Sequence, residues 1–136
     1  MRDPSPSPPL RVLVVDDCED NRESLALLLG TWGYQVCLAR DGPSALEASR
    51  EFRPHAVLLD IGLPGLNGWE LGRRLREQEG TRRVLLVALT GHGTAQDRER
   101  SEHAGLDAHL TKPPDLQELQ RLLADAHAWP APAGAA

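Results

Sequence analysis

Residues 56–60 read Ala-Val-Leu-Leu-Asp, a short apolar run that ends in a carboxylate. Uninterrupted apolar residues are typical of a strand that is buried on both faces, as in a parallel sheet. The next five residues, Ile-Gly-Leu-Pro-Gly at 61–65, cannot continue a strand and predict a loop. Open α/β sheets place their chemistry at the carboxyl ends of their strands, so we expect the rest of the chain to position Asp60 or to report on its state.

Apolar runs of the same kind occur at four other places. They predict strands over residues 11–15, 34–39, 83–89 and 106–110. Apolar residues at helical spacing occupy most segments between the strands and the one after the last strand, where Leu116 is expected in the buried stripe. The helix expected over residues 94–104 is the exception, because its only apolar residues are Ala95 and Ala104. The expected N-caps of the helices are Asp20, Asn67, Thr94 and Asp115. This alternation predicts an α/β fold, a flavodoxin-like (βα)5 three-layer sandwich with a parallel five-stranded sheet in the order 2-1-3-4-5.

The composition is that of one globular domain in water. The 136 residues carry a net charge of −5, which argues against a nucleic-acid-binding surface, and the chain has no apolar stretch long enough for a membrane span or a secretory signal. Cys18 and Cys37 lack zinc or redox spacing and predict reduced thiols in a cytoplasmic protein. We expect a disordered Pro/Ser arm over 1–9, the folded domain over 10–128 and a disordered tail over 129–136.

Acidic residues follow two strands that the predicted topology makes neighbours. Asp16 and Asp17 follow the first strand, and Asp60 ends the third. Two unit charges about 4 Å apart repel by about 4 kcal/mol at an effective dielectric constant of 20, so three adjacent carboxylates need protons or a cation. An all-oxygen acidic pocket selects a hard cation, and we expect Mg²⁺, with Mn²⁺ as an alternative.

Two further residues end strands at the same edge of the sheet. Thr90 follows the fourth strand and Lys112 the fifth. Taken singly, each would be an ordinary turn or surface residue. Together with the acids and a cation they are the parts that stabilise a phosphoryl group in transfer, with Asp60 as the nucleophile.

These residues resemble the receiver domain of two-component response regulators. The resemblance covers residues 10–123 and rests on five positions in order, each at an expected strand end, which makes it more specific than one short motif. The residues that carry it are Asp16-Asp17, Asp60 followed by Gly-Leu-Pro-Gly at 62–65, Thr90 and Lys112-Pro113. The loop Thr-Gly-His-Gly at 90–93 and the strand Asp-Ala-His-Leu-Thr-Lys-Pro at 107–113 resemble receivers attached to hybrid sensor histidine kinases, so the chain is either a stand-alone or an excised relative of those.

The resemblance implies how a metal ion is held and where a phosphoryl group is accepted. Asp60 is implied to be the phosphoacceptor, and its donor is a sensor histidine kinase or a histidine phosphotransfer domain. Asp17 and Asp60 are implied to bind Mg²⁺ directly, Asp16 through a water molecule, and Gly62 through its backbone carbonyl. In receivers the exposed side of the first helix docks the donor.

The resemblance also implies how the phosphoryl group is bound and sensed. Thr90 and Lys112 are implied to bind its oxygens, and the bond before Pro113 is implied to be cis. Thr90 is then the switch residue together with His109, which stands where receivers usually have Tyr or Phe. Gly62 and His92 occupy positions that tune dephosphorylation.

A single-domain response regulator is therefore the function we expect. It would catalyse its own phosphorylation and dephosphorylation without turning over an external substrate, as a monomer or a phosphorylation-dependent dimer. It would then either bind an unknown downstream protein through the face formed by the fourth strand and helix and the fifth strand and helix, or relay the phosphoryl group onward.

Other functions on the same fold remain as alternatives. One is a receiver-like interaction module that is never phosphorylated, against which the intact acidic pocket argues. A flavin protein would need a phosphate-binding loop where Asp16 and Asp17 stand, and a haloacid-dehalogenase-type phosphatase would need a second Asp at the position of Gly62.

Overall fold

Strands and helices alternate along the whole described chain. The computed structural model describes residues 9–63, 65–91 and 95–126. The expected arm at 1–9 and tail at 129–136 lie almost entirely outside these residues and stay predictions. In chain order the elements are β1 (Arg11–Val15), α1 (Glu19–Thr31), β2 (Gln35–Ala39), α2 (Gly42–Phe52), β3 (Ala56–Asp60), α3 (Gly68–Glu77), the 3-10 helix η1 (Glu79–Thr81), β4 (Leu85–Thr90), α4 (Ala95–His103), β5 (Ala108–Thr111) and α5 (Leu116–Asp125).

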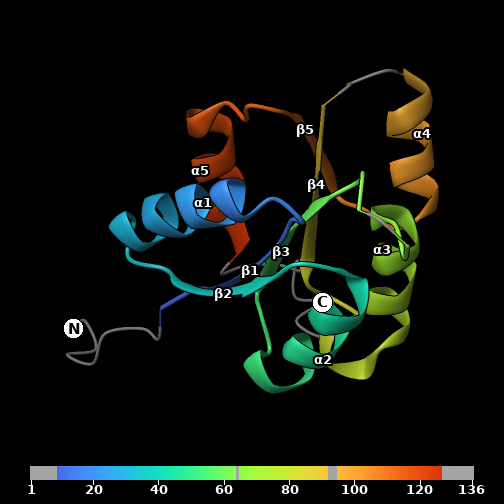
Figure 1. The fold of residues 1–136 in the computed structure, drawn as a ribbon, viewed down its shortest axis with the longest axis horizontal. Helices are drawn as coiled ribbons and strands as arrows, with labels where there is room; N and C mark the ends of the chain where they lie inside the picture. Colours follow the sequence, from blue (N-terminus) through green and yellow to red (C-terminus); the bar gives the residue numbers. More distant parts are fainter. Residues whose placement is uncertain (1–8, 64, 92–94, 127–136) are drawn as a thin grey trace, which may run out of the picture.

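The five strands form one parallel sheet at the centre of the molecule (Figure 1). Their order is β2-β1-β3-β4-β5, as the sequence predicts. Val15 pairs in register with Leu59 of β3 and with Ala39 of β2, so these three strands end at the same level. The carboxyl ends of β1 and β3 therefore meet at the switch point of the strand order, where this kind of sheet binds its ligands.

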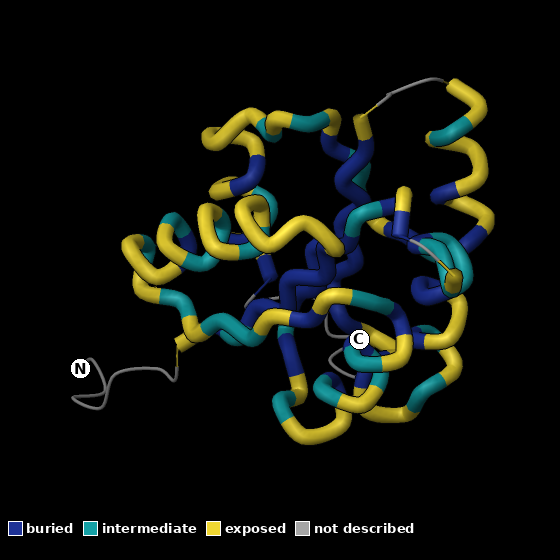
Figure 2. The backbone as a smooth tube through the Cα atoms, viewed as in Figure 1, coloured by how far each residue is buried: buried dark blue, intermediate teal, exposed yellow. Residues whose placement is uncertain are grey.

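The helices cover both faces of the sheet. Helices α1 and α5 pack on one face through Leu29, Leu119 and Leu123, while α2, α3 and α4 pack on the other. The strands β1, β3 and β4 are buried almost throughout (Figure 2), which explains their unbroken apolar sequences. None of the helices in the described part of the chain has the length and apolarity that a membrane span requires.

Side-chain caps fix the start of three helices. Asp41 accepts a hydrogen bond from the backbone of Ser44 at α2, Asn67 accepts one from Glu70 at α3, and Asp115 caps α5. The predictions for Asn67 and Asp115 are confirmed, whereas Thr94 lies outside the described residues.

Two expectations about helix ends are wrong. Helix α1 begins at Glu19 after Cys18, and no side chain caps it, so Asp20 lies inside the helix and not at its N-cap. Leu116 is half exposed at the start of α5, and the buried stripe of that helix consists of Leu119 and Leu123. Helix α1 thus starts earlier than the sequence pattern predicts, and Leu116 is exposed at the first residue of α5.

Helix α3 is tied closely to the end of β3. Gly68 is its first residue, and a Cβ atom there would lie 2.7 Å from the backbone oxygen of Asp60 and from the Cα atom of Ile61. Real Cβ atoms do not approach backbone so closely, so only glycine fits this position. The start of α3 thereby supports the backbone that carries Asp60.

Helix α4 is held mainly by polar contacts. Its inner face carries the buried residue Ser101, whose hydroxyl accepts a hydrogen bond from the indole N–H of Trp69 at 3.1 Å. The guanidinium of Arg100 stacks over the same indole ring, 3.7 Å from its centroid. Trp69 of α3 therefore anchors a helix that has little apolar surface of its own.

Candidate functional site

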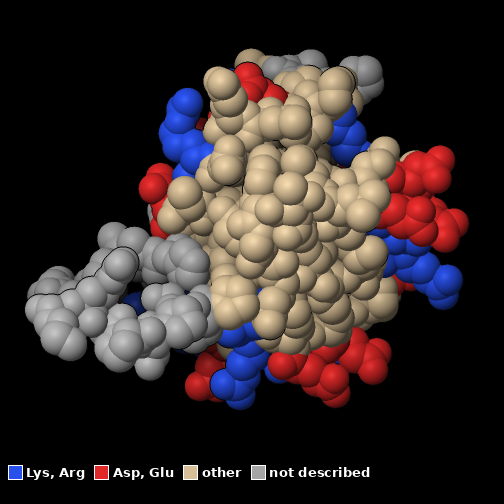
Figure 3. All heavy atoms as spheres, turned by 90° about the vertical axis from the view of Figure 1, so that its left-hand side faces the viewer, with Lys and Arg blue, Asp and Glu red and all other residues tan. Residues whose placement is uncertain are grey.

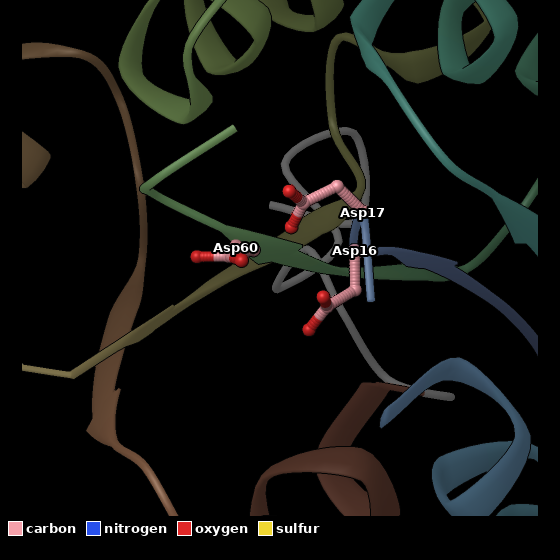
Figure 4. Close-up of side chains that lie close together, drawn as sticks. All are labelled: Asp16, Asp17 and Asp60. Carbon is pink, nitrogen blue, oxygen red and sulfur yellow. The ribbon is translucent and has the colours of Figure 1, made fainter. Parts of the chain in front are cut away.

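Three carboxylates gather at the carboxyl ends of two neighbouring strands (Figure 4). Asp16 and Asp17 directly follow β1, and Asp60 is the last residue of β3. One oxygen of each carboxylate lies within 4.8 Å of the oxygens of the other two. Asp16 is buried, the side chain of Asp60 is 13% exposed, and Asp17 is exposed. The cluster is thus open to solvent on the side of Asp17.

Every polar group of Asp16 has a partner. Its backbone N–H donates to the carbonyl of Ala39 on β2, and its own carbonyl accepts a hydrogen bond of 2.8 Å from the guanidinium of Arg22. Its carboxylate accepts one bond from the backbone N–H of Cys18 at 2.9 Å and another from the ammonium of Lys112 at 3.1 Å. The last two bonds satisfy a carboxylate that is only 1% exposed, and the first two satisfy its backbone.

Lys112 joins the two inner acids. Its Nζ atom lies 3.1 Å from Asp16 Oδ2 and 3.1 Å from Asp60 Oδ2, so one ammonium bridges β1, β3 and the end of β5. Burial lowers the pKa of Lys112, but the hydrogen bonds and charges of Asp16 and Asp60 outweigh this effect and raise the pKa above its ordinary value of 10.5. The lysine therefore stays charged throughout the neutral pH range.

The charge of this cluster suits a divalent cation. Three ionised carboxylates and one ammonium leave a formal charge of −2. Like charges this close are unfavourable unless a cation joins them. Carboxylate oxygens are ligands that Mg²⁺ prefers, and the exposed side at Asp17 leaves room for the water molecules that Mg²⁺ keeps. The residues present therefore fit a magnesium site.

The loop after β3 contacts the carboxylate of Asp60. The backbone N–H of Gly62 donates to Asp60 Oδ1 at 2.8 Å, while the other oxygen faces Lys112. A Cβ atom at position 62 would lie 3.5 Å from Asp60 Oδ1, so glycine leaves that side of the carboxylate open. Thr90 ends β4 next to this loop and is buried. The loop is joined to β4 by a hydrogen bond from the backbone N–H of Ile61 to the carbonyl of Leu89, the residue before Thr90.

His109 lies one strand further along the sheet. It is half-buried on β5, where it pairs in register with Ala88 of β4. Both ring nitrogens are buried and have no hydrogen-bond partner among the described residues. Burial lowers the pKa of His109 below its ordinary value of 6.5, Arg98 of α4 lowers it further, and Asp97 opposes this shift. The imidazole is therefore neutral at pH 7 and faces α4.

The remaining predicted site residues are Pro113 and His92. The peptide bond between Lys112 and Pro113 is cis. His92 lies outside the described residues, so its role in dephosphorylation stays a prediction.

Two features near the acids were not predicted from the sequence. The first is the bond from Arg22 to the backbone of Asp16, which depends on the reach of a long side chain. The second is a groove of about 600 Å³ between α1 and the loop before α5, which Asp16 and Lys112 border. Apolar residues line most of its remaining wall, among them Leu25, Leu28 and the half-exposed Leu116.

Comparison with known proteins gives relatives over most of the chain. Response regulator MprA of Mycobacterium sp. (strain KMS) is 42% identical over 111 residues, which is 82% of this chain and 47% of that protein. The chain thus spans about half the length of the MprA relatives that it matches.

Two solved structures share the fold. The receiver domain of the sensor histidine kinase PA1611 from Pseudomonas aeruginosa PAO1, with a magnesium ion coordinated in its active-site cleft, superposes with a TM-score of 0.78 at 37% identity, covering 85% of this chain and 95% of the other. The complex of the Saccharomyces cerevisiae histidine phosphotransfer signalling protein Ypd1 with the receiver domain of its downstream response regulator Ssk1 gives a TM-score of 0.78 at 29% identity, over 87% of this chain and 88% of the other.

A family assignment follows from the fold, the acidic cluster and the sequence match together. The family described as response regulator receiver domain matches residues 12–124, which is nearly all of the folded part. The chain belongs to the receiver domains of two-component response regulators.

Proposed function

We propose that Asp60 accepts a phosphoryl group from a phosphohistidine on a sensor histidine kinase or a histidine phosphotransfer domain. The observation that carries this proposal is the convergence of Asp16, Asp17 and Asp60 with the ammonium of Lys112. In the reaction an oxygen of the Asp60 carboxylate forms a bond to phosphorus while the bond from phosphorus to the donor's imidazole nitrogen breaks. The product is an acyl phosphate on Asp60 and a free histidine on the donor.

Mg²⁺ is the cation we propose for this site, with Mn²⁺ as a substitute. Asp17 and Asp60 would bind it directly, Asp16 through a water molecule, and Gly62 through its backbone carbonyl. When bound, the ion supplies positive charge next to the phosphoryl oxygens and so lowers the cost of bringing a dianion to an acidic pocket. The formal charge of −2 on the cluster supports this assignment.

Lys112 and Thr90 bind the phosphoryl oxygens in this proposal. Lys112 already touches Asp60, and its raised pKa keeps the ammonium charged, so it can transfer a contact from the carboxylate to the phosphoryl group. Thr90 ends the neighbouring strand and offers a hydroxyl donor. Gly62 leaves one side of Asp60 open, which supports a role in admitting the water that hydrolyses the acyl phosphate.

The groove between α1 and α5 is the docking site that we propose for the phosphodonor. It adjoins Asp16 and Lys112 and is mostly apolar, so a partner bound there would lie next to the phosphoacceptor. Residues 24–39, which include the second half of α1 and all of β2, contain no charged side chain. Figure 3 shows this side of the molecule as a wide uncharged face with charged side chains around its rim. An apolar helical surface of the donor fits such a face.

Thr90 and His109 are the switch residues of this proposal, and β4, α4, β5 and α5 form the output face. Phosphorylation would draw Thr90 toward Asp60 and allow the neutral His109 to follow. Helix α4, which rests on Trp69 through one hydrogen bond and one cation–π contact, can then shift at a small cost in packing. The shifted face would then bind a downstream partner. Alternatively, the phosphoryl group would pass on to another histidine.

Replacement of Asp60 tests the phosphoacceptor. Incubation of the wild type with acetyl phosphate and Mg²⁺ is expected to add the mass of one phosphoryl group, and chelation of the metal is expected to prevent this. Asp60→Asn retains the shape of the side chain but loses the nucleophile, so mass spectrometry is expected to find no modification. Phosphorylation that persists in Asp60→Asn would refute the assignment, and an unmodified wild type would favour the interaction module that is never phosphorylated.

Replacement of Leu116 tests the docking groove. Leu116→Glu places a charge in an apolar contact, and we expect transfer from a phosphorylated histidine phosphotransfer domain to slow by about tenfold, which corresponds to about 1.4 kcal/mol of lost binding. Phosphorylation by acetyl phosphate is expected to be unchanged, because this small donor needs no groove. Leu38→Glu is the matched comparison, since Leu38 is similarly exposed on β2 within the same uncharged face but does not line the groove, so a clearly smaller effect there places the contact in the groove itself. Equal effects of the two variants, or slower reaction with acetyl phosphate, would contradict the proposed docking site.

The pH dependence of stability tests the neutral state of His109. In the unfolded chain this histidine titrates near 6.5, whereas in the folded protein its pKa is lower. Between the two pKa values the unfolded state binds a proton that the folded state does not, so the free energy of unfolding falls as the pH is lowered through about 6.5. In His109→Phe this contribution is absent. Urea unfolding between about pH 7.5 and 5.5 is expected to show the wild type losing stability relative to the variant, and parallel profiles would show that His109 is not held neutral by its surroundings.

A further inference from the structure

We propose that Arg22 is a positioning residue for the metal site and that it acts by orienting Asp17. This inference rests on the proposed function, because it concerns the ligands of the proposed magnesium site. Arg22 lies in the second turn of α1, is half-buried, and donates from Nη1 to the backbone carbonyl of Asp16 at 2.8 Å. The bond joins a helix to the loop that carries two of the three carboxylates.

The carbonyl of Asp16 belongs to the peptide plane that connects Asp16 to Asp17. A peptide unit is planar, so a hydrogen bond that fixes the direction of its carbonyl also fixes its N–H and the path of the chain into the next residue. Arg22 therefore fixes the orientation of the peptide unit that leads into Asp17, from which the Asp17 side chain projects. The bonds to Ala39 and Lys112 hold Asp16 itself, and the bond from the Cys18 N–H to the Asp16 carboxylate fixes the peptide unit that follows Asp17. None of them contacts the carbonyl that Arg22 binds.

Asp17 needs such support more than the other two acids do. Asp16 and Asp60 are each held by Lys112 and by a backbone N–H, from Cys18 and Gly62 respectively. Asp17 is exposed, and across residues 9–63, 65–91 and 95–126 the structure gives its carboxylate no hydrogen bond or ion pair. In Figure 4 its carboxylate nevertheless lies beside the other two. The backbone is what holds it there, and Arg22 is the side chain that holds the peptide unit before it, while the Asp16 carboxylate holds the one after it.

The two possible roles of Arg22, as a nearby positive charge or as a positioning residue, predict opposite changes in Mg²⁺ affinity when Arg22 is removed. If only its charge mattered, Arg22→Ala would make the cluster more negative and Mg²⁺ would bind more tightly. If Arg22 positions Asp17, the same change frees the peptide plane and Mg²⁺ binds more weakly, by about tenfold, as is usual when an outer partner of a metal ligand is lost. The direction of the change therefore separates the two explanations.

Arg40 provides a matched control. It follows β2 at the same edge of the sheet, its side chain is 79% exposed, and its only recorded ion pair in the described chain is a 4.0 Å contact with Asp41. Arg40→Ala removes the same unit of charge without touching the Asp16 carbonyl. We expect it to leave Mg²⁺ affinity unchanged or slightly increased.

Nuclear magnetic resonance titration with Mg²⁺ tests the proposal. The backbone amide signals of Cys18 and Gly62 report the metal site, and in Arg22→Ala we expect saturation at about tenfold higher Mg²⁺. Arg22→Lys keeps the charge and one donor and is expected to recover part of the affinity. In the absence of metal, we also expect the amide signals of Asp17 and Cys18 in Arg22→Ala to move or broaden while those of β1 stay unchanged.

Each outcome bears on the inference. Wild-type or tighter binding of Mg²⁺ by Arg22→Ala would overturn it, as would unchanged amide signals of Asp17 and Cys18. If the wild type itself bound no Mg²⁺, the metal part of the proposed function would fail, and the metal-free amide signals alone would decide on Arg22. If Arg22→Ala did not fold, Arg22→Lys and Arg22→Gln in the same titration would take its place.

Discussion

The ion pairs of Lys112 with Asp16 and Asp60 are the interaction on which the site depends. The sheet topology forces two strands that end in acid to lie side by side, and without a positive charge between them the carboxylates would repel. Lys112 reaches this point because β5 ends at the same edge of the sheet. One ammonium cannot balance three carboxylates, and the residual negative charge makes the site suited to a divalent cation.

Much of the fold and the site can be predicted from the sequence. Unbroken apolar runs such as residues 56–60 identify buried parallel strands, and their alternation with helices leaves few topologies, among which the observed order 2-1-3-4-5 is the expected one. The same topology brings together Asp16, Asp17 and Asp60 from positions far apart in the chain. Helix caps are equally local signals, and Asn67 and Asp115 act as the pattern predicts.

Features that depend on side-chain reach and loop geometry could not be predicted in this way. Asp20 has the pattern of an N-cap, but the carboxylate of Asp16 bonds the backbone of Cys18 instead, and the helix begins at Glu19. Arg22 contacts the carbonyl of Asp16 because α1 starts close to the end of β1, a distance that no periodicity encodes. Trp69 supports α4 through Ser101, a contact between two helices whose relative placement the sequence does not state.

The most direct measurement of the central claim uses the fact that Lys112 is the only lysine in the chain. Selective isotope labelling of lysine gives one side-chain signal, which reports the ammonium between Asp16 and Asp60 without interference. We expect this signal to titrate with a pKa above 10.5 in the absence of metal. We also expect it to shift with added Mg²⁺ until the single metal site is saturated. The result would contradict this claim if Lys112 titrated with a pKa at or below 10.5 and its signal did not change with Mg²⁺, because the ammonium would then not share its charge with Asp16 and Asp60 next to a metal site.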